Sequence, residues 1–258
     1  MSNIEWTDET WNPIVGCSKV SAGCKNCYAM QMASRLEAMG VPQYQGLTTK
    51  QYGKVNWTGE TRLVESALNK PLHWKKPRQI FVNSMGDLFH PSVKFEWIDR
   101  VWEVVLNCPQ HTFQILTKHP TEMLDFIINL DPDHEGGNTI LLGTSVENLE
   151  QTPRIAELNG CLGYRKFVSF EPLLGSVKGV DLTGIDWAIV GGESGTGARP
   201  MKAEWIQEIY DACQKSGTAF FFKQWGNYGE DGIKRSKKAN GRLWQGQTWD
   251  EMPLKAVS

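Results

Sequence analysis

From residue 79 onward, short apolar runs alternate with segments of helical periodicity, and this alternation constrains the fold more than any other feature. Six runs are apolar without strict alternation, which is typical of parallel strands buried on both faces. They are Gln79–Val82, Thr112–Leu116, Thr139–Leu142, Lys166–Phe170, Trp187–Val190 and Ala219–Phe222. An earlier strand is expected near Thr10–Val15. Strands that alternate with helices predict an α/β fold with about seven parallel strands.

Amphipathic segments separate these runs. In one of them, Ile98, Val101, Trp102 and Val105 share a helical face, and Lys202–Gly217 predicts a helix that ends at its glycine. Further helices are expected over Tyr28–Met39, around Met123–Ile127, over Asn148–Leu158 and, as a short stretch, near Glu60–Leu68.

Residues that can bind a ligand follow each expected strand. They are Cys17; Asn83, Ser84 and Asp87; Thr117 and Lys118; Ser145 and Glu147; Glu171; Gly191, Gly192, Glu193 and Ser194; and Lys223 and Gln224. In a (β/α) barrel the carboxyl ends of all strands converge on one mouth, whereas an open doubly wound sheet gathers its ligand contacts at a switch point. The pattern therefore favours a (β/α) barrel, complete or partial.

Length and composition limit the domain organisation. We expect one barrel-like domain over residues 1–226, with an insertion at 40–78, and a C-terminal extension at 227–258 that Trp244 and Trp249 anchor to the barrel. No apolar run reaches membrane-spanning length and the first ten residues are unlike a signal peptide, so a cytoplasmic protein without a membrane partner is predicted. The net charge of −2 excludes a broadly basic surface and leaves room for local basic patches.

Three cysteines lie close together near the N-terminus, at Cys17, Cys24 and Cys27. Structural zinc takes four protein ligands, and most four-iron clusters take four cysteines. Three thiolates would leave one metal position open for a substrate or cofactor. Lys19 and Lys25 lie beside them and favour thiolates electrostatically. The spacing thus predicts a [4Fe-4S] cluster with one open iron, and an incomplete zinc site is the alternative.

An open iron of this kind can chelate the amino and carboxylate groups of S-adenosylmethionine. An electron from the cluster then cleaves the cofactor and yields a 5′-deoxyadenosyl radical, while the protein positions the reactants. Such chemistry requires a reductant protein as electron donor.

The cysteine segment resembles a known signature. Cys24-Lys-Asn-Cys27 is similar to the second half of the radical S-adenosylmethionine motif, although six residues instead of the usual three separate Cys17 from Cys24. Over nearly its full length the chain resembles a phage and bacterial family of unknown function with a three-cysteine motif. The matching segments are Thr10–Cys17, Asn83–Phe89, Ser169–Gly175, Val190–Pro200 and Phe222–Gly226. The likeness to radical enzymes implies an enzyme of that class.

This likeness implies roles for the residues at the expected mouth. Asn26 and Tyr28 would border the adenine of the cofactor, and Ser84 and Asp87 would contact its amino group. Lys118 would pair with its carboxylate, and Ser145 and Glu147 would contact the ribose or the carboxylate. Further ligand contacts are expected from Gly191, Gly192, Arg199 and Gln224, and proton transfer from Glu171, Glu193 and Lys223. Internal salt bridges at the mouth are the alternative for each charged residue.

Two basic clusters indicate the class of substrate. One cluster is Trp74, Lys75 and Lys76, and the other lies within Lys234–Lys238. Aromatic residues can stack on bases and basic residues can hold phosphates, so these clusters favour a nucleotide or nucleic acid as the substrate. The alternative function is a non-catalytic zinc or iron–sulfur module that binds nucleic acid or a protein partner, with a histidine or carboxylate as fourth ligand. A barrel that has lost its activity and serves as a scaffold is a third hypothesis.

Overall fold

The structure is a computed structural model that describes residues 4–130 and 137–253. It divides into two compact units, Met1–Leu141 and Leu142–Ser258. The separation of a barrel domain at 1–226 from an extension at 227–258 stays a prediction. Among the described residues, no helix is both long and apolar enough to cross a membrane.

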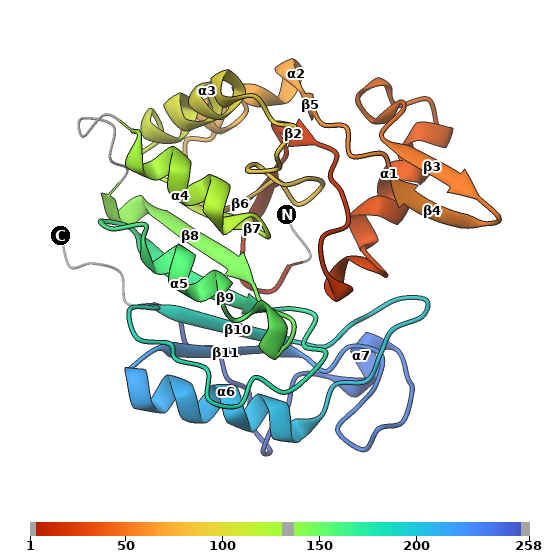
Figure 1. The fold of residues 1–258 in the computed structure, drawn as a ribbon, viewed down its shortest axis with the longest axis vertical. Coiled ribbons are helices and arrows are strands. Elements are labelled where there is room, and N and C mark those ends of the chain that lie inside the picture. Colours follow the sequence, from red (N-terminus) through yellow and green to blue (C-terminus); the bar gives the residue numbers. More distant parts are fainter. Residues whose placement is uncertain (1–3, 131–136, 254–258) are drawn as a thin grey trace. The chain divides into compact units, whose positions relative to one another are not determined.

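Seven strands follow one another in a single sheet (Figure 1). In sheet order they are β1 (Glu9–Trp11), β6 (Gln79–Val82), β7 (Thr112–Thr117), β8 (Ile140–Ser145), β9 (Arg165–Phe170), β10 (Trp187–Gly191) and β11 (Ala219–Gln224). β6 pairs in parallel with β1 and β7, and β10 pairs in parallel with β9 and β11. The order has β1 and β11 at its two ends, so the predicted α/β fold is confirmed in its partial-barrel form.

The first unit carries the N-terminal strands, the insertion and three longer helices. Its remaining elements are β2 (Ile14–Val15), η1 (Ala22–Cys24), α1 (Tyr28–Ala38), η2 (Pro42–Tyr44), β3 (Thr48–Gln51), β4 (Lys54–Trp57), β5 (Arg62–Leu63), α2 (Glu65–Leu68), η3 (Pro71–His73), α3 (Phe95–Leu106), α4 (Pro120–Ile128) and η5 (Gly137–Thr139). The expected strand at Thr10–Val15 is divided into β1 and β2. Pro13 stands between them, and it has no N–H to give to a strand ladder.

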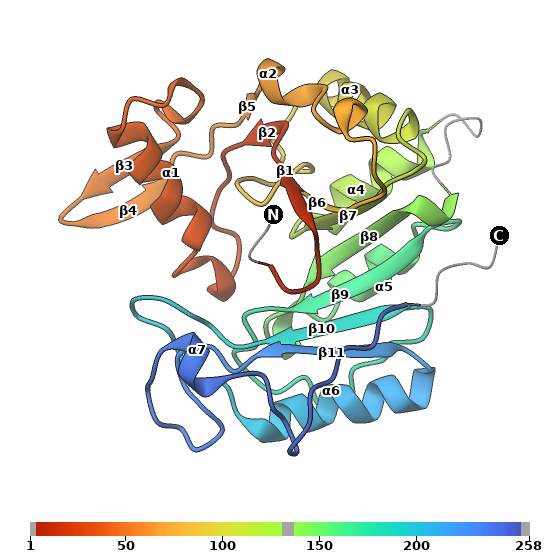
Figure 2. The ribbon, with the colours of Figure 1, turned by 180° about the vertical axis from the view of Figure 1, so that it is seen from behind.

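The insertion differs from its expected form. The helix expected over Glu60–Leu68 is confined to α2, because Arg62–Leu63 forms β5 and pairs antiparallel with β2. The insertion also contains an antiparallel hairpin, β3–β4, which lies beside α1 in both views (Figures 1 and 2). Val55 and Trp57 of β4 pack into one apolar cluster with Ala29, Met30 and Ala33 of α1.

The second unit contains β9, β10 and β11, with η6 (Leu149–Gln151), α5 (Arg154–Asn159), α6 (Ala203–Ser216) and α7 (Lys237–Asn240). Gly217 ends α6 at a left-handed φ of 74°, as its sequence position predicts. Trp244 is 2% exposed and its ring packs against Tyr210, Phe220 and Trp249. These contacts place Trp244 against α6 and β11.

Candidate functional site

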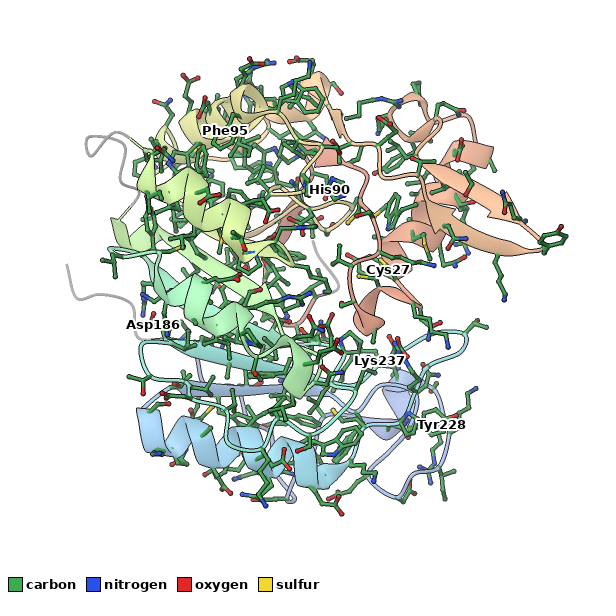
Figure 3. The ribbon with its side chains drawn as sticks, in the orientation of Figure 1. Cys27, His90, Phe95, Asp186, Tyr228 and Lys237 are labelled. Carbon is green, nitrogen blue, oxygen red and sulfur yellow. The ribbon has the colours of Figure 1, made fainter. Side chains whose placement is uncertain are left out.

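The cysteine loop, residues 16–27, begins where β2 ends. Gly16 donates its N–H to the Met85 carbonyl at 3.2 Å and bridges to Gly86, so the loop starts against the segment that follows β6. Cys24 lies in η1, and Cys27 is the N-cap residue of α1, where Figure 3 shows it. A metal-bound sulfur at this position would lie at the positive end of the α1 helix dipole.

The three thiols lie in one neighbourhood. Burial raises the pKa of the Cys17 thiol, and the nearby charges of Asp87, Cys24 and Cys27 raise it further. Cys17 donates its S–H to the Ser18 carbonyl at 3.3 Å, and the Cys24 sulfur lies 3.8 Å from the Ser21 hydroxyl. Clustered thiols that repel each other as thiolates are a donor set that a cationic metal cluster would stabilise.

The three thiols do not form a metal site in the structure. Within residues 4–130 and 137–253, no group of three or more His, Cys, Asp or Glu side chains has the arrangement of a metal site. The donor set of three thiols fits a three-thiolate cluster in its chemistry. The three-cysteine ligand set stays a prediction.

The loop after β6 is held against β2 and α1 by polar contacts. Asn83 has a left-handed φ of 59°, and its side-chain oxygen accepts the Ile14 N–H at 3.2 Å. Ser84 donates its hydroxyl to the Asn12 side chain, and its carbonyl accepts the Tyr28 hydroxyl at 2.7 Å. Two residues predicted to contact a cofactor, Tyr28 and Ser84, are thus brought together beside Cys27.

Asp87 joins this loop to the end of β7. Its carboxylate is 6% exposed and accepts the Thr117 hydroxyl at 2.6 Å, the Lys118 N–H at 3.0 Å and the Phe89 N–H at 3.1 Å. Asp87 and Lys118, predicted from separate strand ends, therefore meet through the Lys118 main chain. Asn26, the remaining cofactor candidate in this unit, is half-buried within the cysteine loop.

A histidine network also reaches the cysteine loop. The Nε2 atom of His90 lies 2.8 Å from the Ser18 hydroxyl, its Nδ1 atom lies 2.9 Å from the Ser92 hydroxyl, and its ring packs against His119 (His90 is labelled in Figure 3). Burial, and then the proximity of His119, lower the pKa of His90 and favour the neutral ring. The sequence places His90 after the second expected strand but does not reveal its bond to Ser18.

In the second unit, Glu171 and Lys223 form an ion pair. The Lys223 Nζ lies 2.8 Å from a Glu171 oxygen, and both side chains are 16% exposed. Glu171 follows β9, Lys223 belongs to β11, and Gly191 ends β10 between them. A Cβ atom at Gly191 would lie 2.5 Å from the Glu171 carboxylate, so glycine at this position makes room for the ion pair.

Glu193 is held by Arg199. The guanidinium donates to both carboxylate oxygens, at 2.9 and 2.6 Å, and the Arg199 N–H adds a third bond at 2.9 Å. These hydrogen bonds raise the pKa of Arg199. Glu193 is 5% exposed, so the two residues expected to meet a ligand or transfer a proton also form a buried internal salt bridge.

The other expected contact residues of this unit are tightly packed. Glu147 is fully buried, and the Arg154 guanidinium donates both to it at 3.2 Å and to the Ser145 carbonyl at 2.8 Å. Gln224 donates its side-chain amide to the Gly192 carbonyl at 3.0 Å. At Gly192 an added Cβ would overlap the Trp225 carbonyl oxygen.

We expect Arg199→Ala to lower the free energy of unfolding by about 2 kcal/mol. Removal of one partner of a buried ion pair costs about 3–5 kcal/mol, and solvent access to the half-buried arginine reduces this. Arg235→Ala removes the exposed ion pair with Asp231 and should leave stability unchanged. Urea unfolding of the variants measures both effects. Equal losses would show that the Glu193 carboxylate is solvated and not buried.

Comparison with known proteins places the chain in a family. A solved structure titled "Spore photoproduct lyase complexed with dinucleoside spore photoproduct" is similar at a TM-score of 0.39 and 10% sequence identity, over 79% of this chain. The alignment spans 60% of that protein's length. No curated protein sequence matches. The family model described as "Protein of unknown function (DUF5131)" matches residues 1–253. The chain therefore belongs to the DUF5131 family, as the likeness to a family of unknown function led us to expect.

Proposed function

We infer that the chain is a radical S-adenosylmethionine enzyme whose cysteine loop holds a [4Fe-4S] cluster through Cys17, Cys24 and Cys27. The observation that supports this most directly is the clustering of three thiols on a short loop packed against the polar segment after β6. When bound by three thiolates, such a cluster supplies the electron for reductive cleavage of S-adenosylmethionine.

The chain's own residues would bind and orient the reactants. Asn26, Tyr28 and Ser84 lie on the cysteine loop, the start of α1 and the loop after β6, and would border the adenine and amino groups of the cofactor. Asp87 holds that loop on β7 and brings Lys118 beside it, where the ammonium would pair with the cofactor carboxylate. These contacts would fix the cofactor in one orientation.

The second unit would supply further contacts and proton transfer. Glu171 and Lys223 form an ion pair with a 2.8 Å contact, and the two side chains would together move a proton on a substrate. Ligand contacts are proposed for Ser145, Glu147, Gly191, Gly192, Arg199 and Gln224. Glu193 would orient Arg199 as well as serve as a proton carrier. A reductant protein would donate the electron.

A zinc module is the competing function, because His90 bonds to Ser18 on the cysteine loop and offers an imidazole near the thiols. Electron paramagnetic resonance separates the two functions. Protein reconstituted with iron and sulfide without oxygen, and then reduced, should give a four-iron signal that changes shape when S-adenosylmethionine is added. A bound zinc ion in the anaerobically purified protein, with no cluster signal after reconstitution, would contradict the enzymatic proposal.

A further inference from the structure

The turn of the β3–β4 hairpin has an unfavourable residue. Tyr52 and Gly53 connect the two strands, and both have positive φ angles, of 48° and 75°. Two-residue turns with two positive φ angles strongly prefer Asn-Gly, Asp-Gly or Gly-Gly. A bulky aromatic residue in the left-handed region is a conformational outlier. Tyr52 therefore costs the hairpin stability that asparagine would not.

The Tyr52 side chain does not recover this cost by burial. The Tyr52 side chain is fully exposed, at 102% of its reference area, while Val55 and Trp57 of the same hairpin are buried. Its ring thus buries no apolar surface in this unit. Backbone outliers that the core does not require point to a function outside the fold.

The charges around Tyr52 indicate what the ring would meet. Lys50 and Lys54 flank it on β3 and β4, both exposed, and the hairpin Thr48–Trp57 contains no acidic residue. An exposed aromatic ring with one exposed lysine two residues before it and another two residues after it matches the chemistry of single-stranded nucleic acid, in which bases stack on aromatic side chains and phosphates pair with lysines.

The base of the hairpin is fixed to the cysteine loop. Lys19 of that loop donates to the Asn56 side chain at 2.5 Å, and Val55 and Trp57 share an apolar cluster against which Cys17 and Cys27 pack. Four residues on each strand carry Tyr52 about 14 Å outward from this base, at 3.4 Å per residue.

The helix α1 fixes the other strand. Glu37 accepts the Thr48 hydroxyl at 2.7 Å and the Gly46 N–H at 2.8 Å. The hydrogen bond from Gly46 lowers the pKa of Glu37 most, and the bond from Thr48 lowers it further. Both bonds are thus made to the ionised carboxylate of Glu37. The hairpin is therefore held at both strands, and its tip carries Tyr52 and the two lysines.

We propose that the β3–β4 hairpin binds single-stranded nucleic acid, with a base stacked on Tyr52 and phosphates paired with Lys50 and Lys54. That this nucleic acid is the substrate rests on the proposed function, whereas binding itself does not. Because the base of the hairpin contacts the cysteine loop, a strand bound at Tyr52 would lie about 14 Å from that base.

Fluorescence anisotropy of the full chain with labelled 20-nucleotide oligothymidylate and oligouridylate tests the stacking. Tyr52→Ala should weaken binding by between about fivefold and 150-fold, the range measured for loss of one base–aromatic stack. Tyr52→Phe keeps the ring face and should bind within about twofold of the wild type. Tyr52→Asn should bind as weakly as the alanine variant, yet melt at or above the wild-type temperature because asparagine suits the turn.

The salt dependence of binding tests the two lysines. Each phosphate contact with a single strand adds about 0.7 to the slope of log affinity against log salt concentration. Lys50→Gln and Lys54→Gln should each reduce the magnitude of the slope by about 0.7. Lys178→Gln removes an exposed lysine of the second unit and should leave the slope unchanged.

Three outcomes would overturn the proposal: no binding by the wild type, unchanged affinity in Tyr52→Ala, or equal effects of the hairpin lysines and Lys178. Tighter binding of one oligonucleotide would support it and identify the strand as DNA or RNA. The binding measurements do not require the cluster. Loss of the nucleic-acid proposal would therefore leave a positive electron paramagnetic resonance result intact, and a negative resonance result would leave the binding result intact.

Discussion

Cys24→Ala should leave the reconstituted protein almost without iron and sulfide, and Cys17→Ala and Cys27→Ala should do the same. Three thiolates are the smallest set that holds a site-differentiated four-iron cluster, and removal of one exposes a second iron to water. The expected result is a fall from about four irons per chain to a small residual fraction. Iron and acid-labile sulfide assays on protein reconstituted without oxygen measure it.

The other cysteines provide matched controls. Cys161 and Cys213 are both 0% exposed and lie in the second unit, far in sequence from the loop that carries Cys17, Cys24 and Cys27. Cys161→Ala and Cys213→Ala should keep the full iron content. A full cluster in any variant of the triplet, with wild-type folding by circular dichroism, would contradict the ligand assignment.

The strands of the sheet could be predicted because burial on both faces leaves a plain sequence signal. β6 has the predicted bounds, Gln79–Val82, and β10 extends its prediction by one residue to Gly191. A continuous apolar run between polar segments needs no tertiary information to be recognised. The positions of ligand-type residues at strand ends followed from the same signal.

The hairpin escaped prediction because its pattern is weak. All but the first residue of β3 are exposed, so Thr48–Gln51 shows no apolar alternation. Its turn is Tyr52-Gly53 where a recognisable hairpin turn would read Asn-Gly. The feature that hides the hairpin in the sequence is the same exposed tyrosine that points to its function.

The pairing of charged residues also required the structure. Glu171 and Lys223 are far apart in sequence, and only the adjacency of β9, β10 and β11 brings them to 2.8 Å. The sequence predicts such residues at strand ends and leaves open whether they meet a ligand or each other. The structure shows that Glu147, Glu171 and Glu193 each have a cationic partner.

Gly16→Ala should lower the free energy of unfolding by about 3 kcal/mol. Gly16 has a φ of 98°, which costs an L-residue about 1–2 kcal/mol. An added Cβ would also overlap the Glu60 carbonyl oxygen and lie 3.0 Å from the Thr61 Cα, and such overpacking costs about 1–3 kcal/mol. Both neighbours are backbone atoms, which cannot turn aside as a side chain can.

Gly40→Ala is the matched control for this variant. Gly40 has a φ of 78°, and nothing lies within 4 Å of its added Cβ, so only the conformational cost of about 1 kcal/mol should remain. Urea unfolding followed by circular dichroism measures both variants. Since Gly16 precedes Cys17 and fixes the loop through the Met85 carbonyl, its variant should also lose iron, whereas the Gly40 variant should not. Equal losses of stability, with full iron in both, would show that the cysteine loop does not need its close approach to Glu60.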